Sequence, residues 1–271
     1  MIKSFTVLLF FVLCTMYYVL PIFAQDFTFT KARTDYVFTE DNYKNDLFDF
    51  NLKKASYFKN PTLSNKELLR TATYKFIGTR NSYIKNYLTM LRIKTLESTG
   101  IDQSKKEEVY TKVDPEVTWY DLRKNSYNPA DTLEDLISKS HDEDLRLKST
   151  SLPIIYFSLT HISLGEVKNL RLKHIKLYDN LKKESAELIK LGRADSGLFD
   201  RWFRDIDQEL SNIITIESKT LQEIDKIFGD DEYKRDGGYK NAIEELDPAK
   251  LGLLKLNEFI KELENVIANK R

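Results

Sequence analysis

Cysteine is almost absent from this chain of 271 residues, which holds a single one, Cys14. That cysteine lies in an apolar run near the N-terminus, and Phe11-Val12-Leu13 before it lack the small residue expected ahead of a lipid-modified cysteine. Beyond this run the chain has no thiol, which excludes disulfides, a cysteine nucleophile and thiolate metal ligands there. The stability of the main body must therefore come from packing.

Glycine and proline are also scarce, at nine and six residues, less than half of average usage. This scarcity argues against a fold built from many tight turns and favours helices. The chain also has no excess of charge of either sign, because 42 basic residues balance 42 acidic ones. No net field would draw nucleic acid or an anionic surface to the chain, so we predict no nucleic-acid partner.

Motifs that carry chemistry are missing too. The three histidines are not spaced as ligand pairs, and His161 and His174 lie too far apart on one predicted helix to share a metal. There is no Gly-x-Ser-x-Gly turn and no glycine-rich phosphate loop. Carboxylates such as Glu166 and Asp179 are scattered, as on helix surfaces. We predict no catalytic residue, no cofactor and no metal site, and hence a protein that is not an enzyme.

The N-terminus carries the most informative functional signal. Lys3 precedes an uncharged apolar run from Phe5 to Leu20, and Ala24 offers a small residue before Gln25. This pattern predicts a secretory signal peptide over residues 1–24, cleaved between Ala24 and Gln25. Because Ile22 is large for its position before the cut, an uncleaved N-terminal membrane anchor is the alternative. Both place the body outside the cytoplasm, either secreted or tethered to the outer face of the cytoplasmic membrane. The lack of a usable Asn-x-Ser/Thr acceptor favours a bacterial export route.

The longest helical periodicity runs from Ser151 to Phe228. Two amphipathic segments flank a turn at Gly192–Gly197 and predict a long antiparallel helical hairpin. Its apolar positions are Leu159, Ile162, Val167, Leu170, Ile175, Leu177 and Leu181 in the first helix, and Phe199, Phe203, Ile206, Leu210, Ile213, Leu221, Ile224 and Phe228 in the second.

The C-terminal end predicts a loop at Gly229–Gly238 and a last helix that starts at Asp247-Pro248. Two heptads of apolar residues in this helix form a coiled-coil seam of Leu253, Leu256, Ile260, Leu263 and Ile267. The seam could either fold back on the hairpin or pair with a second copy of the chain.

Aromatic residues are concentrated just after the N-terminal segment. Six residues near a 3.5-residue repeat predict one helix whose stripe faces a partner, and Phe38 and Phe48 lie off it. The stripe comprises Phe29, Tyr36, Tyr43, Leu47, Phe50 and Tyr57. Such a stripe is typical of a core, although an aromatic platform for glycan or peptide is the functional alternative.

Boundary signals divide the rest of the N-terminal half into helices. Asn60-Pro61 ends the first helix, and a capping box at Ser64–Glu67 is predicted to start the next, which would close at Thr99-Gly100. Further starts are predicted at the Ser104–Glu107 box, at Asp114-Pro115, as two short helices or one kinked one, and at Asn128–Asp131. The apolar repeat lapses around His141–Asp144, which indicates a hinge before Ser151.

These patterns together predict an all-α protein, an elongated multi-helix bundle with a long antiparallel hairpin and coiled-coil-like packing. We divide it into an aromatic-rich helical bundle at residues 25–150 and the hairpin with the C-terminal helix at residues 151–271. The candidate interaction surface consists of Tyr43, Tyr57, Tyr83, Tyr87, Leu253, Leu256, Ile260, Leu263 and Ile267.

The first half of the chain holds the motifs Asp35-Tyr36-x-Phe38, Tyr43, Tyr57-Phe58, Thr62-Leu63-Ser64, Tyr87-Leu88-Thr89-x-Leu91-Arg92-x-Lys94 and Val117-x-Trp119-Tyr120. In this order they resemble a group of uncharacterised secreted helical proteins from candidate-phylum bacteria with small genomes. The resemblance implies export and an all-helical fold, and it brings no activity, cofactor or catalytic residue.

From the sequence we therefore expect a noncatalytic, exported scaffold, adaptor or spacer of the bacterial cell envelope. It would bind an envelope protein or itself through helix faces. The alternative is an extracytoplasmic ligand-binding module with an aromatic groove for glycan, peptide or lipid. A third hypothesis, a cell-wall enzyme, would require buried acids with shifted pKa values that converge in a groove.

Overall fold

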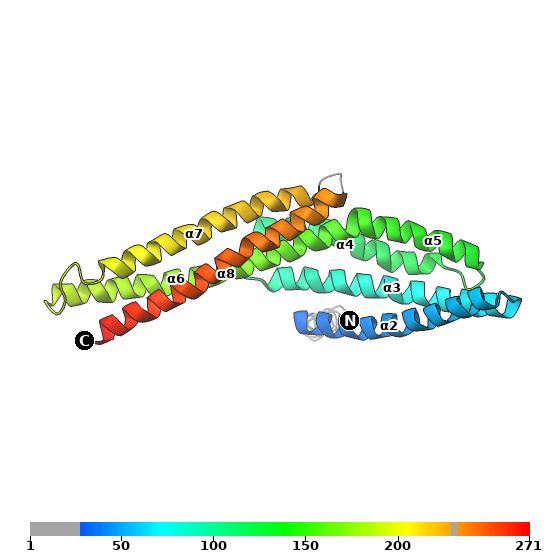
Figure 1. Ribbon diagram of the computed structural model, residues 1–271, viewed down its shortest axis with the longest axis horizontal. Coiled ribbons are helices and arrows are strands. Elements are labelled where there is room, and N and C mark those ends of the chain that lie inside the picture. Colours follow the sequence, from blue (N-terminus) through cyan, green and yellow to red (C-terminus); the bar gives the residue numbers. More distant parts are fainter. Residues whose placement is uncertain (1–27, 229–231) are drawn as a thin grey trace, which may run out of the picture.

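The computed structural model describes residues 28–228 and 232–271, and within them the chain is helical with no strand. The all-α, elongated bundle is confirmed (Figure 1). The predicted signal or anchor at residues 1–24, with its cleavage point between Ala24 and Gln25, lies outside the described residues. Among the described residues, no helix has both the length and the apolar composition needed to cross a bilayer.

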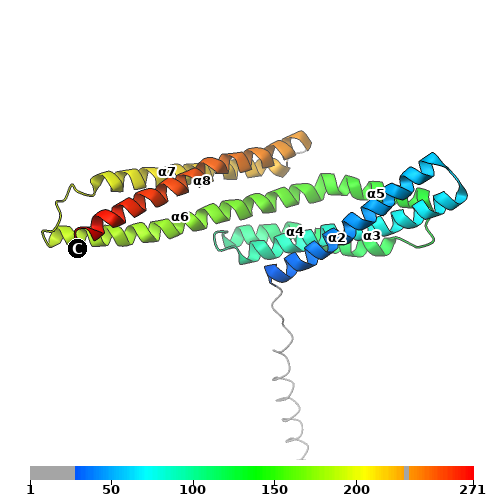
Figure 2. The ribbon, with the colours of Figure 1, turned by 60° about the horizontal axis from the view of Figure 1, so that its bottom comes forward.

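Seven α-helices account for most of the described chain. They are α2 (Phe29–Lys59), α3 (Leu63–Glu97), α4 (Gln103–Arg123), α5 (Leu133–Arg146), α6 (Leu152–Lys190), α7 (Asp200–Ile224) and α8 (Glu232–Ala268). Helices α2 to α5 gather at one end of the molecule, and α7 and α8 lie along the far part of α6 at the other (Figures 1 and 2).

The junction near residue 150 is helical throughout. Helix α5 continues through a π-helical turn at Leu147–Ser151 directly into α6. The lapse in the apolar repeat at His141–Asp144 lies within α5, the widened turn follows it, and the two predicted halves are joined by one uninterrupted helical rod (Figure 2).

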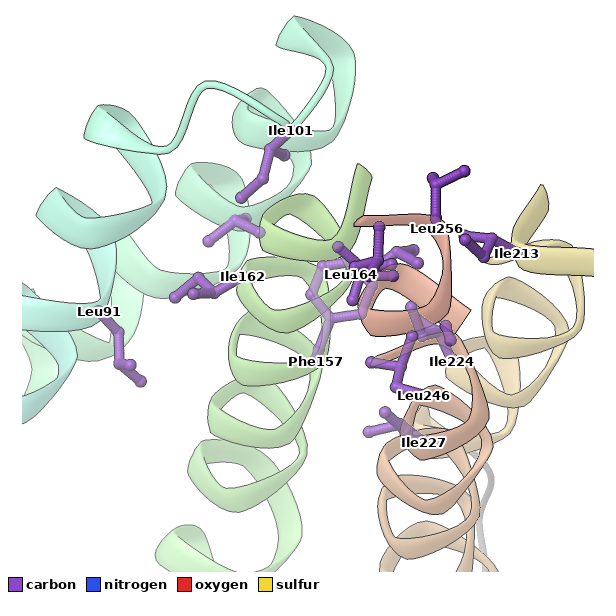
Figure 3. Close-up of a cluster of buried hydrophobic side chains, with 14 of the residues drawn as sticks. Leu91, Ile101, Phe157, Ile162, Leu164, Ile213, Ile224, Ile227, Leu246 and Leu256 are labelled. Carbon is purple, nitrogen blue, oxygen red and sulfur yellow. The ribbon is translucent and has the colours of Figure 1, made fainter. Parts of the chain in front are cut away.

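The hairpin of α6 and α7 is completed by α8, which packs more extensively on each of them than they do on each other. All five residues of the predicted coiled-coil seam are buried in this core, so the seam folds back on its own hairpin. Figure 3 shows Ile213 and Ile224 of α7 meeting Leu246 and Leu256 of α8. Four residues predicted for the hairpin's buried stripe are exposed instead, because the neighbouring helices cover only part of each long helix: Leu170, Leu177, Leu221 and Phe228.

Helix α6 ends in a Schellman motif, where the sequence predicted a turn. Gly192 has a positive φ of 67°, and the Arg193 and Gly192 amides donate to the Leu188 and Ile189 carbonyls at 2.9 and 3.0 Å. A residue without a Cβ adopts this conformation at no steric cost.

Several predicted helix starts were wrong, and at α3 and α5 a nearby threonine supplies the cap. Helix α3 begins after Thr62, whose hydroxyl accepts from the Asn65 amide at 3.2 Å, and not at the Ser64–Glu67 box. Helix α5 begins after Thr132, which forms a capping box with Asp135, whereas Asn128–Asp131 form a turn. Helix α4 follows Asp102 and not Ser104. Helix α3 ends at Glu97, before the predicted glycine cap.

Two prolines expected to start helices lie inside them. Pro115 is in α4, which is a single helix, and Pro248 is in α8, which already begins at Glu232. The predicted loop at Gly229–Gly238 is thus wrong for residues 232–238. An interior proline costs about 3 kcal/mol in an isolated helix. Burial of Val113 next to Pro115, and of Leu246 and Ala249 next to Pro248, offsets that cost.

A close glycine contact joins the α3–α4 connection to α6. A Cβ added at Gly100 would lie 1.7 Å from the carbonyl oxygen of Gly165. This approach lets Ile101 enter the core beside Ile162 and Leu164 (Figure 3). Only a pair of glycines permits two backbones to come so near.

We predict that Gly100→Ala lowers the free energy of unfolding by about 3 kcal/mol, because the added methyl group meets backbone that cannot move aside. Urea denaturation followed by circular dichroism measures the change. Gly78→Ala is the matched control, since a Cβ there meets nothing within 4 Å, and it should stabilise α3 by up to about 1 kcal/mol. Equal stabilities of the two variants would contradict the contact.

Candidate functional site

Aromatic side chains hold α2 against α3. Tyr43 stacks on Tyr83 with ring centroids 5.0 Å apart and an angle of 5° between the planes. Tyr36 lies beside Tyr83 and Tyr87, at centroid distances of 5.4 and 5.3 Å, and the Tyr36 and Tyr83 hydroxyls are 3.2 Å apart. Burial, followed by this hydrogen bond, raises the pKa of Tyr83, so the hydroxyl stays neutral. Three of the four predicted surface tyrosines therefore serve the packing of two helices.

The fourth, Tyr57, lies in an open groove of about 490 Å³ near the far end of the same helix pair. Helices α2 and α5 both pack on α3, and side chains of all three line the groove. These helices lie together at the right-hand end of the molecule in Figure 2. We call it the α2–α5 groove. Its lining consists of Phe50, Lys54, Tyr57 and Phe58 from α2, Leu69, Thr73 and Phe76 from α3, and Leu133, Glu134, Ile137, Ser140, His141 and Asp144 from α5.

Most of this lining is apolar. Phe50 stacks on Phe76 with centroids 5.0 Å apart, and Leu69 and Leu133 are buried beneath. The walls stay open to water, because Phe58 and Ile137 are 71% and 57% exposed. Large apolar side chains that gather around a groove and remain exposed are typical of an interaction site.

The charges around the groove are unequal. Glu134 pairs with Lys66 at 2.7 Å, and Asp144 pairs with Arg80 at 2.8 Å. The Lys66 hydrogen bond lowers the pKa of Glu134, which therefore stays ionised. The Lys54 ammonium lies 5.6 Å from the Phe50 ring centroid and has no carboxylate partner in the part of the chain that the structure describes. The groove therefore offers one uncompensated positive charge, beside the exposed His141.

The sequence predicts the aromatic stripe, offers an aromatic groove as the alternative function and places Tyr57 in the candidate interaction surface. It does not indicate that Phe58 and α5 border the groove. The signal that could have found it is Phe58, which directly follows Tyr57 of the stripe at the end of the helix. Adjacent residues of a helix point in different directions, so Phe58 cannot face the helix that Tyr57 faces. Only the placement of α5 beside α2 shows what Phe58 borders.

Two buried glutamates join α3, α4 and α5, and sequence reasoning missed both. Glu143 accepts from Arg80 at 2.6 Å, Asn81 at 2.9 Å and Arg123 at 3.2 Å, and also from the Tyr127 hydroxyl. Glu143 is 2% exposed, and nothing in its sequence context distinguishes it from surface acids. Burial, followed by the hydrogen bond to Glu143, raises the pKa of Tyr127, so this phenol remains a donor.

The second glutamate, Glu116, is equally buried. Arg146 donates to it at 2.5 Å and Ser151 at 2.8 Å, and the Ser151 hydroxyl lies 2.9 Å from that of Tyr120. Burial raises the pKa of Tyr120 to about 12. Neither glutamate lines the α2–α5 groove, and arginines of the chain itself neutralise both. This geometry matches polar cross-links between helices at the π-helical turn.

We predict that Glu143→Ala lowers the free energy of unfolding by about 3 to 5 kcal/mol, because it leaves Arg80 and the polar groups around it buried without their acceptor. Chemical denaturation measures the loss. Glu244→Ala, which removes an exposed helix-surface pair with Lys240, should change stability by less than about 0.5 kcal/mol. A similarly small effect of Glu143→Ala would show that the cluster does not stabilise the fold.

A smaller hollow of about 240 Å³ lies where the α3–α4 connection meets α6 and α7, and His161 lines it. Among the described residues, His161 Nε2 is buried and finds no hydrogen-bond partner. The neighbouring charges are paired, Lys168 with Asp102 and Arg171 with Glu217, each at 2.8 Å. The hollow thus shows no excess charge that would select a ligand.

Burial, reinforced by the positive charge of Lys105, lowers the pKa of His161 to about 4, against the opposing effects of Glu108 and Asp225. Because the folded pKa lies below that of an unfolded histidine, about 6.5, stability is lost as pH falls from about 6.5 to about 4. We predict that this one group costs about 2.5 kcal/mol at pH 4.5 relative to pH 7.

The variant His161→Gln, which cannot titrate, should lose correspondingly less stability over the same interval. Urea denaturation of both proteins at pH 7 and pH 4.5 measures the difference, in which the contribution of the shared carboxylates cancels. Parallel pH profiles would contradict a neutral, buried His161.

Among the described residues, no three histidine, cysteine, aspartate or glutamate side chains gather where they could hold a metal ion. Comparison of the chain with models of protein families, with curated proteins and with solved structures finds no match. The α2–α5 groove, with its open aromatic walls, is therefore the strongest candidate site that the geometry itself supplies.

Proposed function

We propose that this protein is a noncatalytic scaffold or adaptor of the bacterial cell envelope that acts through helix–helix contacts, with the α2–α5 groove as its binding site. The observation that carries the proposal is the exposed aromatic and apolar lining of this groove, in which Phe58 and Ile137 stand open to water. Phe58 and Ile137 are large apolar residues that the folding of the chain leaves mostly exposed.

The elongated shape supports the same proposal. Helices α2, α3 and α5, which line the groove, lie at one end of the rod, whereas the turn between α6 and α7 lies at the other (Figure 1). Helix α6 alone is about 60 Å long for its 39 residues, so a partner bound at the groove would be held well away from that turn. Such separation suits a spacer or adaptor.

The envelope location rests on the N-terminal segment. A charged residue, an apolar run and a small residue before Gln25 support export, with residues 1–24 either cleaved or retained as an anchor. The resemblance to secreted helical proteins of candidate-phylum bacteria supports the same location. The partner would then be another envelope protein or a second copy of this chain.

The groove's size and aromatic lining favour a second candidate function, a ligand-binding module for glycan, peptide or lipid. A volume of about 490 Å³ is that of a small-molecule site. However, such sites bury roughly 70 to 90% of the ligand, and walls as exposed as Phe58 and Ile137 would leave much of it in water. The open geometry fits a protein surface better.

Photo-crosslinking in the producing bacterium tests the adaptor function. With a benzoylphenylalanine at Phe58 we expect a covalent adduct with a second protein, and the same probe at Lys219, on the exposed face of α7, should give none. The adduct should disappear when Ile137→Glu is added, because a charge in the groove opposes docking of apolar side chains. Absence of a groove-specific protein adduct, or turnover of a cell-wall substrate by the purified protein, would contradict the proposal.

A further inference from the structure

We infer that the α2–α5 groove takes an amphipathic α-helix of a partner protein, with large apolar side chains on one face and an acidic residue beside them. The inference rests on the adaptor function proposed above and names the chemistry of the partner. It follows from the spacing of the lining residues, from the charge of the groove, and from the kinds of ligand that this lining cannot serve.

Each wall of the groove is one face of one helix. The lining positions recur at helical spacing, singly or as adjacent pairs: 50, 54, 57 and 58 on α2, 69, 73 and 76 on α3, and 133, 134, 137, 140, 141 and 144 on α5. Three helix faces that converge in this way leave the position of a missing fourth helix in a bundle. The longest wall spans about 16 Å along α5, which matches about three turns of a docked helix.

The charge of the groove selects an acidic partner. Glu134 and Asp144 are already paired within the chain, whereas Lys54 is free of carboxylates in the described part of the chain. A helix that placed an aspartate or glutamate opposite Lys54 would supply the counter-charge at the groove's edge. A lysine there would meet like charge, and so the groove discriminates by sign.

The lining also argues against other occupants. A peptide that binds by strand addition needs a sheet edge, and the described residues contain no strand. A lipid chain would stay largely in water between walls as exposed as Phe58 and Ile137.

The probe is a display library built on one amphipathic helical peptide of about five turns, with the positions of its apolar face and one flanking edge randomised. Selection on the purified protein should enrich aromatic residues or leucine at positions i, i+3 or i+4, and i+7, together with aspartate or glutamate at the edge. Selected peptides should lose affinity by about tenfold or more on Ile137→Glu, as expected for the centre of an interface.

Reversing the charge at Lys54 gives the more specific test. Selection on Lys54→Glu should enrich lysine or arginine at the edge position, with the apolar spacing unchanged. Leu122→Glu is the matched control, because Leu122 is an exposed leucine of α4 outside the groove, and it should leave binding unaltered. Circular dichroism checks that each variant is folded. If Ile137→Glu proves unfolded, Phe58→Ser, at an exposed position, replaces it.

The inference is overturned by binders that ignore the groove variants, by binders without helical spacing, or by an acidic preference that persists on Lys54→Glu. It is also overturned if no binder is recovered, or if sedimentation shows that a second copy of the chain already fills the groove. Helical binders with no adduct in cells would leave the inference standing and remove the adaptor function. A cellular adduct without helical binders would leave the adaptor function standing and overturn the inference.

Discussion

The fold depends on the burial of apolar side chains along α6. One continuous core reaches from Leu91 and Ile101, at the α3–α4 connection, across Phe157 and Ile162 to the facing rows of α7 and α8 (Figure 3). With no disulfide to constrain the unfolded chain, this burial has to offset the conformational entropy of ordering long helices. The glycine contact between Gly100 and Gly165 matters because it brings the N-terminal helices close enough to share that core.

Burial of apolar surface does not by itself fix how the helices are oriented, and hydrogen bonds and ion pairs between them do. Near the π-helical turn, Glu143 binds two arginines and a tyrosine hydroxyl, and Glu116 binds one arginine and a serine hydroxyl. Arg171 forms two hydrogen bonds with Glu217 between α6 and α7. A buried carboxylate is costly unless all its partners are in place. Such clusters therefore penalise helix arrangements in which the same apolar faces would slide past one another.

The groove is a consequence of unequal coverage. Helix α2 relies on α3 for its packing, through Tyr36, Tyr43 and Phe50, and α5 covers only part of the remaining surface of α3. Between the two helices, apolar side chains at the edge of the groove, such as Phe58 and Ile137, stay largely exposed. The candidate site thus arises from the same packing that stabilises the fold.

The sequence by itself determined that the chain is helical, where the long hairpin turns and which residues of α8 form a seam, because these depend on apolar spacing along one helix. It misplaced several helix starts and treated Pro115 and Pro248 as boundaries, because local capping and proline signals compete with burial that comes from distant helices. Only the tertiary structure decided that the α8 seam folds inward, that Glu143 and Glu116 are buried, and that Phe58 of α2 and Ile137 of α5 line one groove. These are relations between residues far apart in the chain, and the periodicity of one helix carries no information about which neighbour will cover it.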